Sequence, residues 1–87
     1  MPHARTTAEV DRWFADRIVE ITDRERESWD EYLRTIQGLV PEVYEQTEAL
    51  AWRRLRRTMA SLAHDRRRHE FERDRAVAEI RGVRLAG

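Results

Sequence analysis

The chain has 87 residues, of which 39% are charged, and its 17 arginines balance 17 acidic residues. The absence of cysteine excludes disulfide bonds and cysteine-ligated zinc. No apolar run approaches the roughly 20 residues that a membrane-spanning helix needs. These features predict one small all-α domain over residues 1–87, soluble in the cytoplasm and without a membrane partner.

The first predicted helix covers residues 7–37 and follows a start, residues 1–6, that we expect to be disordered. Thr6 and Glu9 fit a capping box, in which each side chain caps a backbone N–H at the helix start. Apolar residues then recur at helical spacing and define one face. They are Val10, Phe14, Ile18, Ile21, Trp29, Tyr32 and Ile36. A second capping-box match begins at Thr22, so an alternative breaks this helix in two near that residue.

A turn over residues 38–41 and a second helix over residues 42–81 follow, and residues 82–87 form a tail. Gly38 ends the first helix, and Pro41 suits the first turn of the next because its missing N–H has no helical partner there. Gly82 is a candidate C-cap glycine. The apolar face of the second helix consists of Tyr44, Ala51, Leu55, Met59 and Leu62, and resumes at Val77 and Ile80.

Two long helices joined by a short link predict an antiparallel helical hairpin. A turn centred near residues 39 and 40 places Trp29 beside Leu50 and Tyr32 beside Thr47. The same register places the acidic stretch of residues 23–31 alongside the arginines of residues 53–57. Charge favours this register, because residues 1–50 hold six arginines and twelve acids, whereas residues 51–87 hold eleven and five.

The second helix is longer than the first, so in this register its last turns, residues 76–85, extend beyond the first helix. Apolar side chains on an unsupported helix end need cover, and a second subunit is the simplest source. The sequence therefore predicts a homodimeric four-helix bundle, with docking of another protein as the alternative. The interface residues that we predict are Trp13, Val77, Ile80 and Val83.

The arginine-rich stretch of residues 53–68 has two interpretations. The first is a solvated flank that pairs with the acidic first helix, which exposed ion pairs would stabilise by about 0.2–1 kcal/mol each. The second is nucleic-acid binding, which phosphate contacts from clustered arginines would support. The residues that would carry it are Arg53, Arg54, Arg56, Arg57, Arg66, Arg67 and Arg68. The near-neutral pI and interleaved acids make nucleic acid the weaker alternative.

Charged residues replace apolar ones on the second helix face at Arg66, His69 and Arg73, and Glu25 does the same on the first helix. The side chains either lie in water with their stems on apolar neighbours, or form a paired polar layer that sets the register. A third hypothesis is an anion or metal site in a small helical enzyme, since guanidinium groups bind carboxylates and phosphates.

No catalytic residue can be named, because the chain lacks a nucleophile motif and a glycine-rich phosphate loop. We expect no cofactor and no bound metal. The function that the sequence favours is a small non-catalytic protein–protein interaction module, acting in assembly, as an adaptor or in regulation. The two alternatives are the nucleic-acid-binding protein and the helical enzyme or anion-binding bundle.

Overall fold

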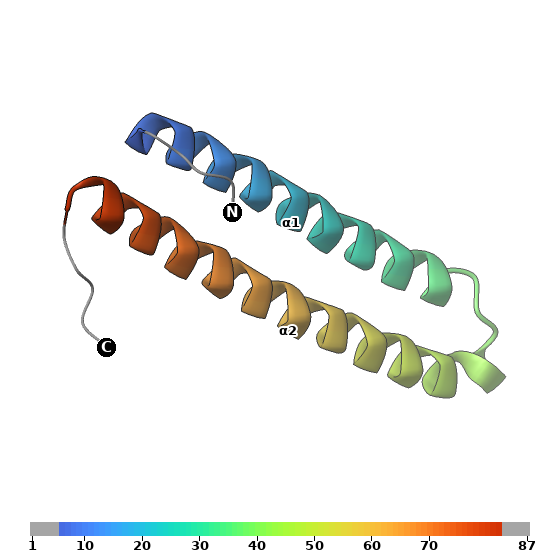
Figure 1. Ribbon diagram of the computed structural model, residues 1–87. Coiled ribbons are helices and arrows are strands. Elements are labelled where there is room, and N and C mark those ends of the chain that lie inside the picture. The colour runs from blue at the N-terminus through green and yellow to red at the C-terminus, as the bar shows by residue number, and fades with distance from the viewer. Residues whose placement is uncertain (1–5, 83–87) are drawn as a thin grey trace.

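A computed structural model describes residues 6–82 and shows an antiparallel hairpin of two helices. Helix α1 covers Thr7–Ile36 and helix α2 covers Pro41–Ile80, and the part described contains no strand. The helices lie side by side along most of their length (Figure 1). The molecule measures 62 × 25 × 13 Å, so it is a single layer of two helices. The predicted fold class is confirmed.

Helix α1 begins where the capping box predicts. The Thr6 side-chain oxygen accepts a hydrogen bond of 3.1 Å from the backbone N–H of Glu9. The helix then continues through Thr22 without a break, so the two-helix alternative is wrong. Ile21 is buried directly before that position, and no glycine or proline interrupts the segment. The buried apolar face therefore outweighs the local capping signal at Thr22.

The link between the helices explains how they are aligned. Gly38 has a φ of +75°, a backbone conformation that favours glycine at the end of a helix. Gln37 and Val40, on either side, have extended backbones. The chain thus continues past the end of α1 before it turns back, and α2 begins beyond that end (Figure 1).

The register therefore differs from the predicted one. Tyr32 contacts Glu48, Trp29 contacts Trp52, and Phe14 contacts Arg73. In each case the partner on α2 lies further along the chain than predicted. The extra length of α2 consequently lies at the link, where its first turns extend past α1 (Figure 1). Up to residue 82, the expected overhang of the C-terminal turns is wrong, because it assumed a tight turn centred at residues 39 and 40.

The core is a thin seam between the helices. In the described part of the chain its buried residues are Val10, Ile21, Ala51, Leu55, Leu62 and Ala78. Burial of a leucine such as Leu55 or Leu62 stabilises the fold by about 1.5–3 kcal/mol. A seam of this size is small for 87 residues, since small domains bury a low fraction of their surface. Within residues 6–82, neither helix is long and apolar enough to cross a membrane.

Candidate interaction surface

Aromatic residues are covered at one end of the hairpin and exposed at the other. We call the end where α1 begins and α2 ends the open end, and its aromatic residues pack across the seam. The Trp13 ring lies edge-on to the His69 ring, with 5.6 Å between centroids. The Arg73 guanidinium lies 4.3 Å from the centroid of the Phe14 ring, within the range of a cation–π contact. Trp13 and Phe14 are both half-buried, so α2 side chains cover their rings.

The predicted polar layer is distributed along the seam. Arg66 donates a hydrogen bond to the Glu25 carboxylate across the two helices, and both side chains are half-buried. His69 contacts Trp13, and its Nδ1 atom is buried without a hydrogen-bond partner within residues 6–82. Arg73 contacts Phe14 and also bonds to Asp74. Arg66, His69 and Arg73 thus contact three different residues of α1.

This arrangement offers little to a bound ion. The described residues include no group of three or more His, Asp or Glu side chains that could hold a metal ion. Glu25 neutralises Arg66, and Asp74 neutralises Arg73. The Oδ1 atom of Asp74 lies 2.9 Å from the Nη2 atom of Arg73. Two arginines that are already paired with carboxylates have lost most of their attraction for an anion.

Three of the predicted interface residues, Trp13, Val77 and Ile80, lie towards the open end. Trp13 and Val77 are half-buried in the single hairpin, whereas Ile80 is 37% exposed. Val83 lies outside the described residues. Of these positions, Ile80 alone is an exposed large apolar side chain in the part of the chain described.

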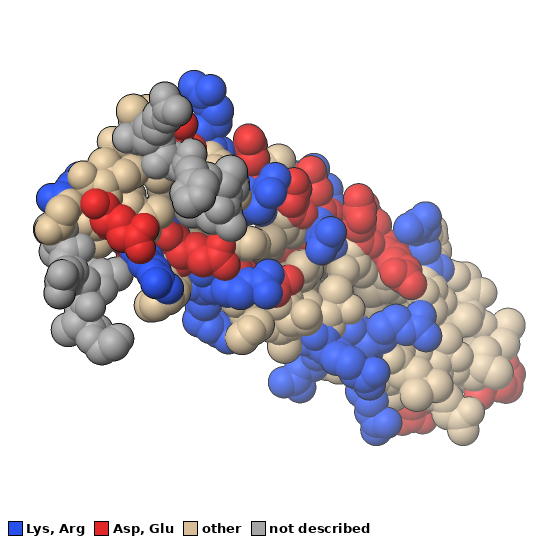
Figure 2. Space-filling model, in the orientation of Figure 1, with Lys and Arg blue, Asp and Glu red and all other residues tan. Residues whose placement is uncertain are grey.

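The turn end, by contrast, leaves its large apolar residues open. Seven of the ten exposed large apolar side chains in residues 6–82 lie between residues 29 and 52, with exposed fractions of 40–61%. We call them the turn-end patch. It consists of Trp29, Leu33, Val40, Val43, Tyr44, Leu50 and Trp52. Figure 2 shows this end of the molecule as largely uncharged surface.

Trp29 and Trp52 of the patch form a cluster of edge-on rings with the half-buried Tyr32. Their centroids are 5.7–6.1 Å apart, which is favourable aromatic geometry. The Tyr32 hydroxyl donates a 2.8 Å hydrogen bond to the Glu48 carboxylate. This bond, together with burial and the nearby negative charge, raises the pKa of Tyr32 above 10.0. The two tryptophans are thus held in place while two-fifths of each remains exposed.

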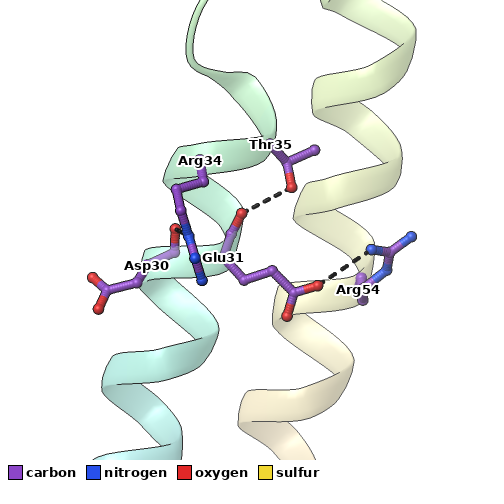
Figure 3. Close-up of polar contacts among 5 residues, drawn as sticks. All are labelled: Asp30, Glu31, Arg34, Thr35 and Arg54. Atoms are coloured by element: carbon purple, nitrogen blue, oxygen red, sulfur yellow. Dashed lines mark hydrogen bonds and ion pairs between the residues drawn. The ribbon is translucent and has the colours of Figure 1, made fainter.

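The arginines of residues 53–68 divide into paired and unpaired groups. Glu31 extends from α1 towards Arg54 of α2, at 3.6 Å, and both side chains are more than half exposed (Figure 3). The same view shows Arg34 and Thr35 bonded to the backbone of their own helix, at the carbonyls of Asp30 and Glu31. Within residues 6–82 the Glu31 carboxylate therefore pairs with Arg54 only.

Arg66 pairs with Glu25, and Arg68 with Asp65 and Glu72. The other four arginines of the stretch make no ion pair within residues 6–82. They are Arg53, Arg56, Arg57 and Arg67. The acidic stretch of α1 thus neutralises one of the four arginines at residues 53–57.

The sequence alone did not identify the turn-end patch. Trp29 is predicted to lie on the apolar face of the first helix, whereas it is 42% exposed. The sequence does contain a signal, since Val43, Leu50 and Trp52 do not fit one helical face together with Leu55 and Leu62. Apolar residues outside the buried face indicate a second surface.

The chain was compared with protein-family models, curated proteins and solved structures, and it matches none of them. We therefore infer the function from the surface chemistry of the hairpin.

Proposed function

We propose that this protein is a non-catalytic protein–protein interaction module that binds through its turn-end patch. Single exposed apolar residues are normal on a protein surface, but a concentration of them at one end of a molecule points to an interaction site. Seven such residues at one end of the hairpin, two of them tryptophans, are the observation that supports this proposal. Tryptophan is enriched among the residues that contribute most to binding.

The overhang supports the same conclusion. The first turns of α2 have no α1 beside them (Figure 1), so Tyr44 is exposed although it lies on the face of α2 that points into the seam. A partner helix packed there would extend the seam and cover these residues. A second hairpin would complete a four-helix bundle. The lack of cysteine suits a reducing compartment, and we propose that the module acts in the cytoplasm.

Site-specific photo-crosslinking tests this function in cells that make the protein. A photoreactive phenylalanine replaces Tyr44 in the patch or, as the matched control, Phe71, an aromatic residue that is 62% exposed elsewhere on α2. We expect crosslinks to protein from position 44 and few from position 71. Equal crosslinking from both positions, or none from position 44, would overturn the proposal.

Nucleic-acid binding is a second candidate, and one observation favours it. Residues 49–64 contain no acidic residue, and Arg53, Arg56 and Arg57 within them have no ion-pair partner in residues 6–82. In Figure 2 arginines lie beside the uncharged end. Titration of a labelled random-sequence duplex at about 50 and 200 mM salt tests it, because binding to phosphates weakens steeply over that range. Tight binding lost at the higher salt would favour this candidate.

A further inference from the structure

We propose that the part of the turn-end patch around Trp29 and Trp52 binds a second copy of this chain, antiparallel along α2. In this contact, Glu42 and Glu45 of each copy face Arg56 and Arg53 of the other. The inference rests on the proposed function and names its partner. It follows from a second stripe on α2, from the charges along that stripe, and from the exposed tryptophans beside it.

The second stripe lies on the flank of α2 that carries Trp52. Residues spaced alternately by three and four lie on one side of a helix, as in a coiled-coil seam. From the start of α2 this spacing selects Glu42, Glu45, Ala49, Trp52, Arg56, Met59 and Ala63. All except Met59 are exposed in the single hairpin, and Met59 is half-buried. Helix α2 therefore has one face for α1 and another that faces solvent.

The charges on this stripe are complementary to those on the same stripe of a second, antiparallel copy. Its acidic residues come first, at Glu42 and Glu45, and its basic residues come later, at Arg53 beside the stripe and Arg56 within it. None of these four makes an ion pair within residues 6–82. A two-fold axis at Ala49 places each acid opposite an arginine of the second copy. A parallel arrangement would place like charges together, so charge selects the antiparallel one.

The shape of the stripe suits this close contact. Ala49 lies at the proposed axis, where small side chains let two helices approach, and it is exposed. Trp52 comes one step further along the stripe, so it lies against α2 of the second copy near its Ala49. The Trp29 ring is 6.1 Å from Trp52 and adds apolar surface from α1 on the same flank. Apolar contact at the centre and charge pairs around it are typical of a specific interface.

The opposite flank of α2 lacks this complementarity. It presents Val43, Thr47, Leu50, Arg54 and Arg57, none of which is acidic. Arg54 is also already paired with Glu31 of its own chain. A second copy packed antiparallel on that flank would find apolar residues but no carboxylate for its arginines. We therefore assign the second copy to the Trp52 flank.

A charge-exchange experiment tests the pairing. One variant carries Glu42→Arg and Glu45→Arg, and the other carries Arg53→Glu and Arg56→Glu, with sedimentation equilibrium as the readout. We expect wild-type dimers, a dimer dissociation constant at least about tenfold higher for each variant alone, and recovery to within about threefold when the two are mixed. Arg67→Glu, at another unpaired arginine, is the matched control and should leave dimerisation unchanged.

The register is tested by a single cysteine, since the natural chain has none. Ala49→Cys places the two thiols together at the two-fold axis, so mild oxidation should join the copies. Ala63 is an exposed alanine two heptads further along the same stripe. Ala63→Cys should therefore form little disulfide-linked dimer. Equal joining at both positions would overturn the register.

Two outcomes separate this inference from the proposed function. A wild-type chain that stays monomeric, or two charge variants that do not recover on mixing, would overturn self-pairing along this flank. Crosslinks from position 44 to a different protein would then support the interaction module but show that its partner is not a second copy of this chain. If position 44 gives no protein crosslinks, the module itself is wrong. Circular dichroism of every variant shows whether the hairpin has kept its helices.

Discussion

The open end and the turn end of the hairpin are built from the same two helices, yet they differ in how far those helices cover each other. At the open end Val10 is completely buried, and Trp13 and Phe14 contact α2. At the turn end α2 extends past α1, and Tyr44 is exposed although it lies on the face of α2 that points into the seam. The difference follows from the extended backbone of the link, which shifts α2 along α1. Helix alignment, and not composition, therefore decides which apolar residues are free to bind.

The largest effect should come from the same substitution made at both ends. Val10→Ala removes two methyl groups from a completely buried site, so we expect a loss of about 2 kcal/mol in the free energy of unfolding. Val43→Ala, at a side chain that is 44% exposed, should change it by less than about 0.5 kcal/mol. Urea unfolding followed by circular dichroism at low protein concentration measures both. Similar losses would show that the turn end is as well packed as the open end.

Much of the helical architecture could be predicted from local chemistry. The hydrogen bond at Thr6, the glycine conformation at Gly38 and proline at the first position of α2 all lie where their residue types predict. The helix bounds accordingly differ from the predicted ones by a single residue. These signals depend on the residues nearest to them, so a sequence shows them directly.

The register could not be predicted in the same way. It depends on the path of the link, where Pro41 favours the extended backbone of Val40 but no local signal required that of Gln37. It also depends on where polar residues enter the seam. Glu25 lies in the seam because Arg66 pairs with it, whereas the apolar Trp29 lies at its edge with 42% of its surface exposed. The position of the turn-end patch follows from the register, and so it was missed.

The two positive-φ glycines allow a smaller, matched comparison between the ends. Gly38, in the link, has a φ of +75°, and Gly82, after α2, has a φ of +73°. An alanine in this conformation costs about 1 kcal/mol, and neither site has a steric clash to add. We expect Gly38→Ala to show the full loss in thermal or urea unfolding. Gly82→Ala should cost a few tenths of a kcal/mol, because the last turn can fray to relieve the strain. Equal losses would show that α2 is held as firmly at its end as at the link.

The smallest effect concerns the hydrogen bond that holds the aromatic cluster at the turn end. The pKa of Tyr32 is raised because the neutral hydroxyl donates to Glu48 and because ionisation would place a second negative charge beside that carboxylate. A raised pKa in the folded state means that this contribution to stability is fully present below pH 10 and is lost as the pH rises through the folded value. In a Tyr44→Phe background, Tyr32 is the sole tyrosine, so tyrosinate absorbance reports on it alone.

In that background we expect the Tyr32 titration to lie above pH 10, and Glu48→Gln to move it towards 10. The substitution keeps a hydrogen-bond acceptor but removes the charge, so part of the increase should remain. The helical content should be unchanged at neutral pH, because the bond lies at the edge of the seam. If Glu48→Gln leaves the titration where it was, Glu48 does not hold Tyr32. The two tryptophans would then owe their positions to ring contacts alone, and the rigidity of the turn-end patch would rest on Trp29 and Trp52.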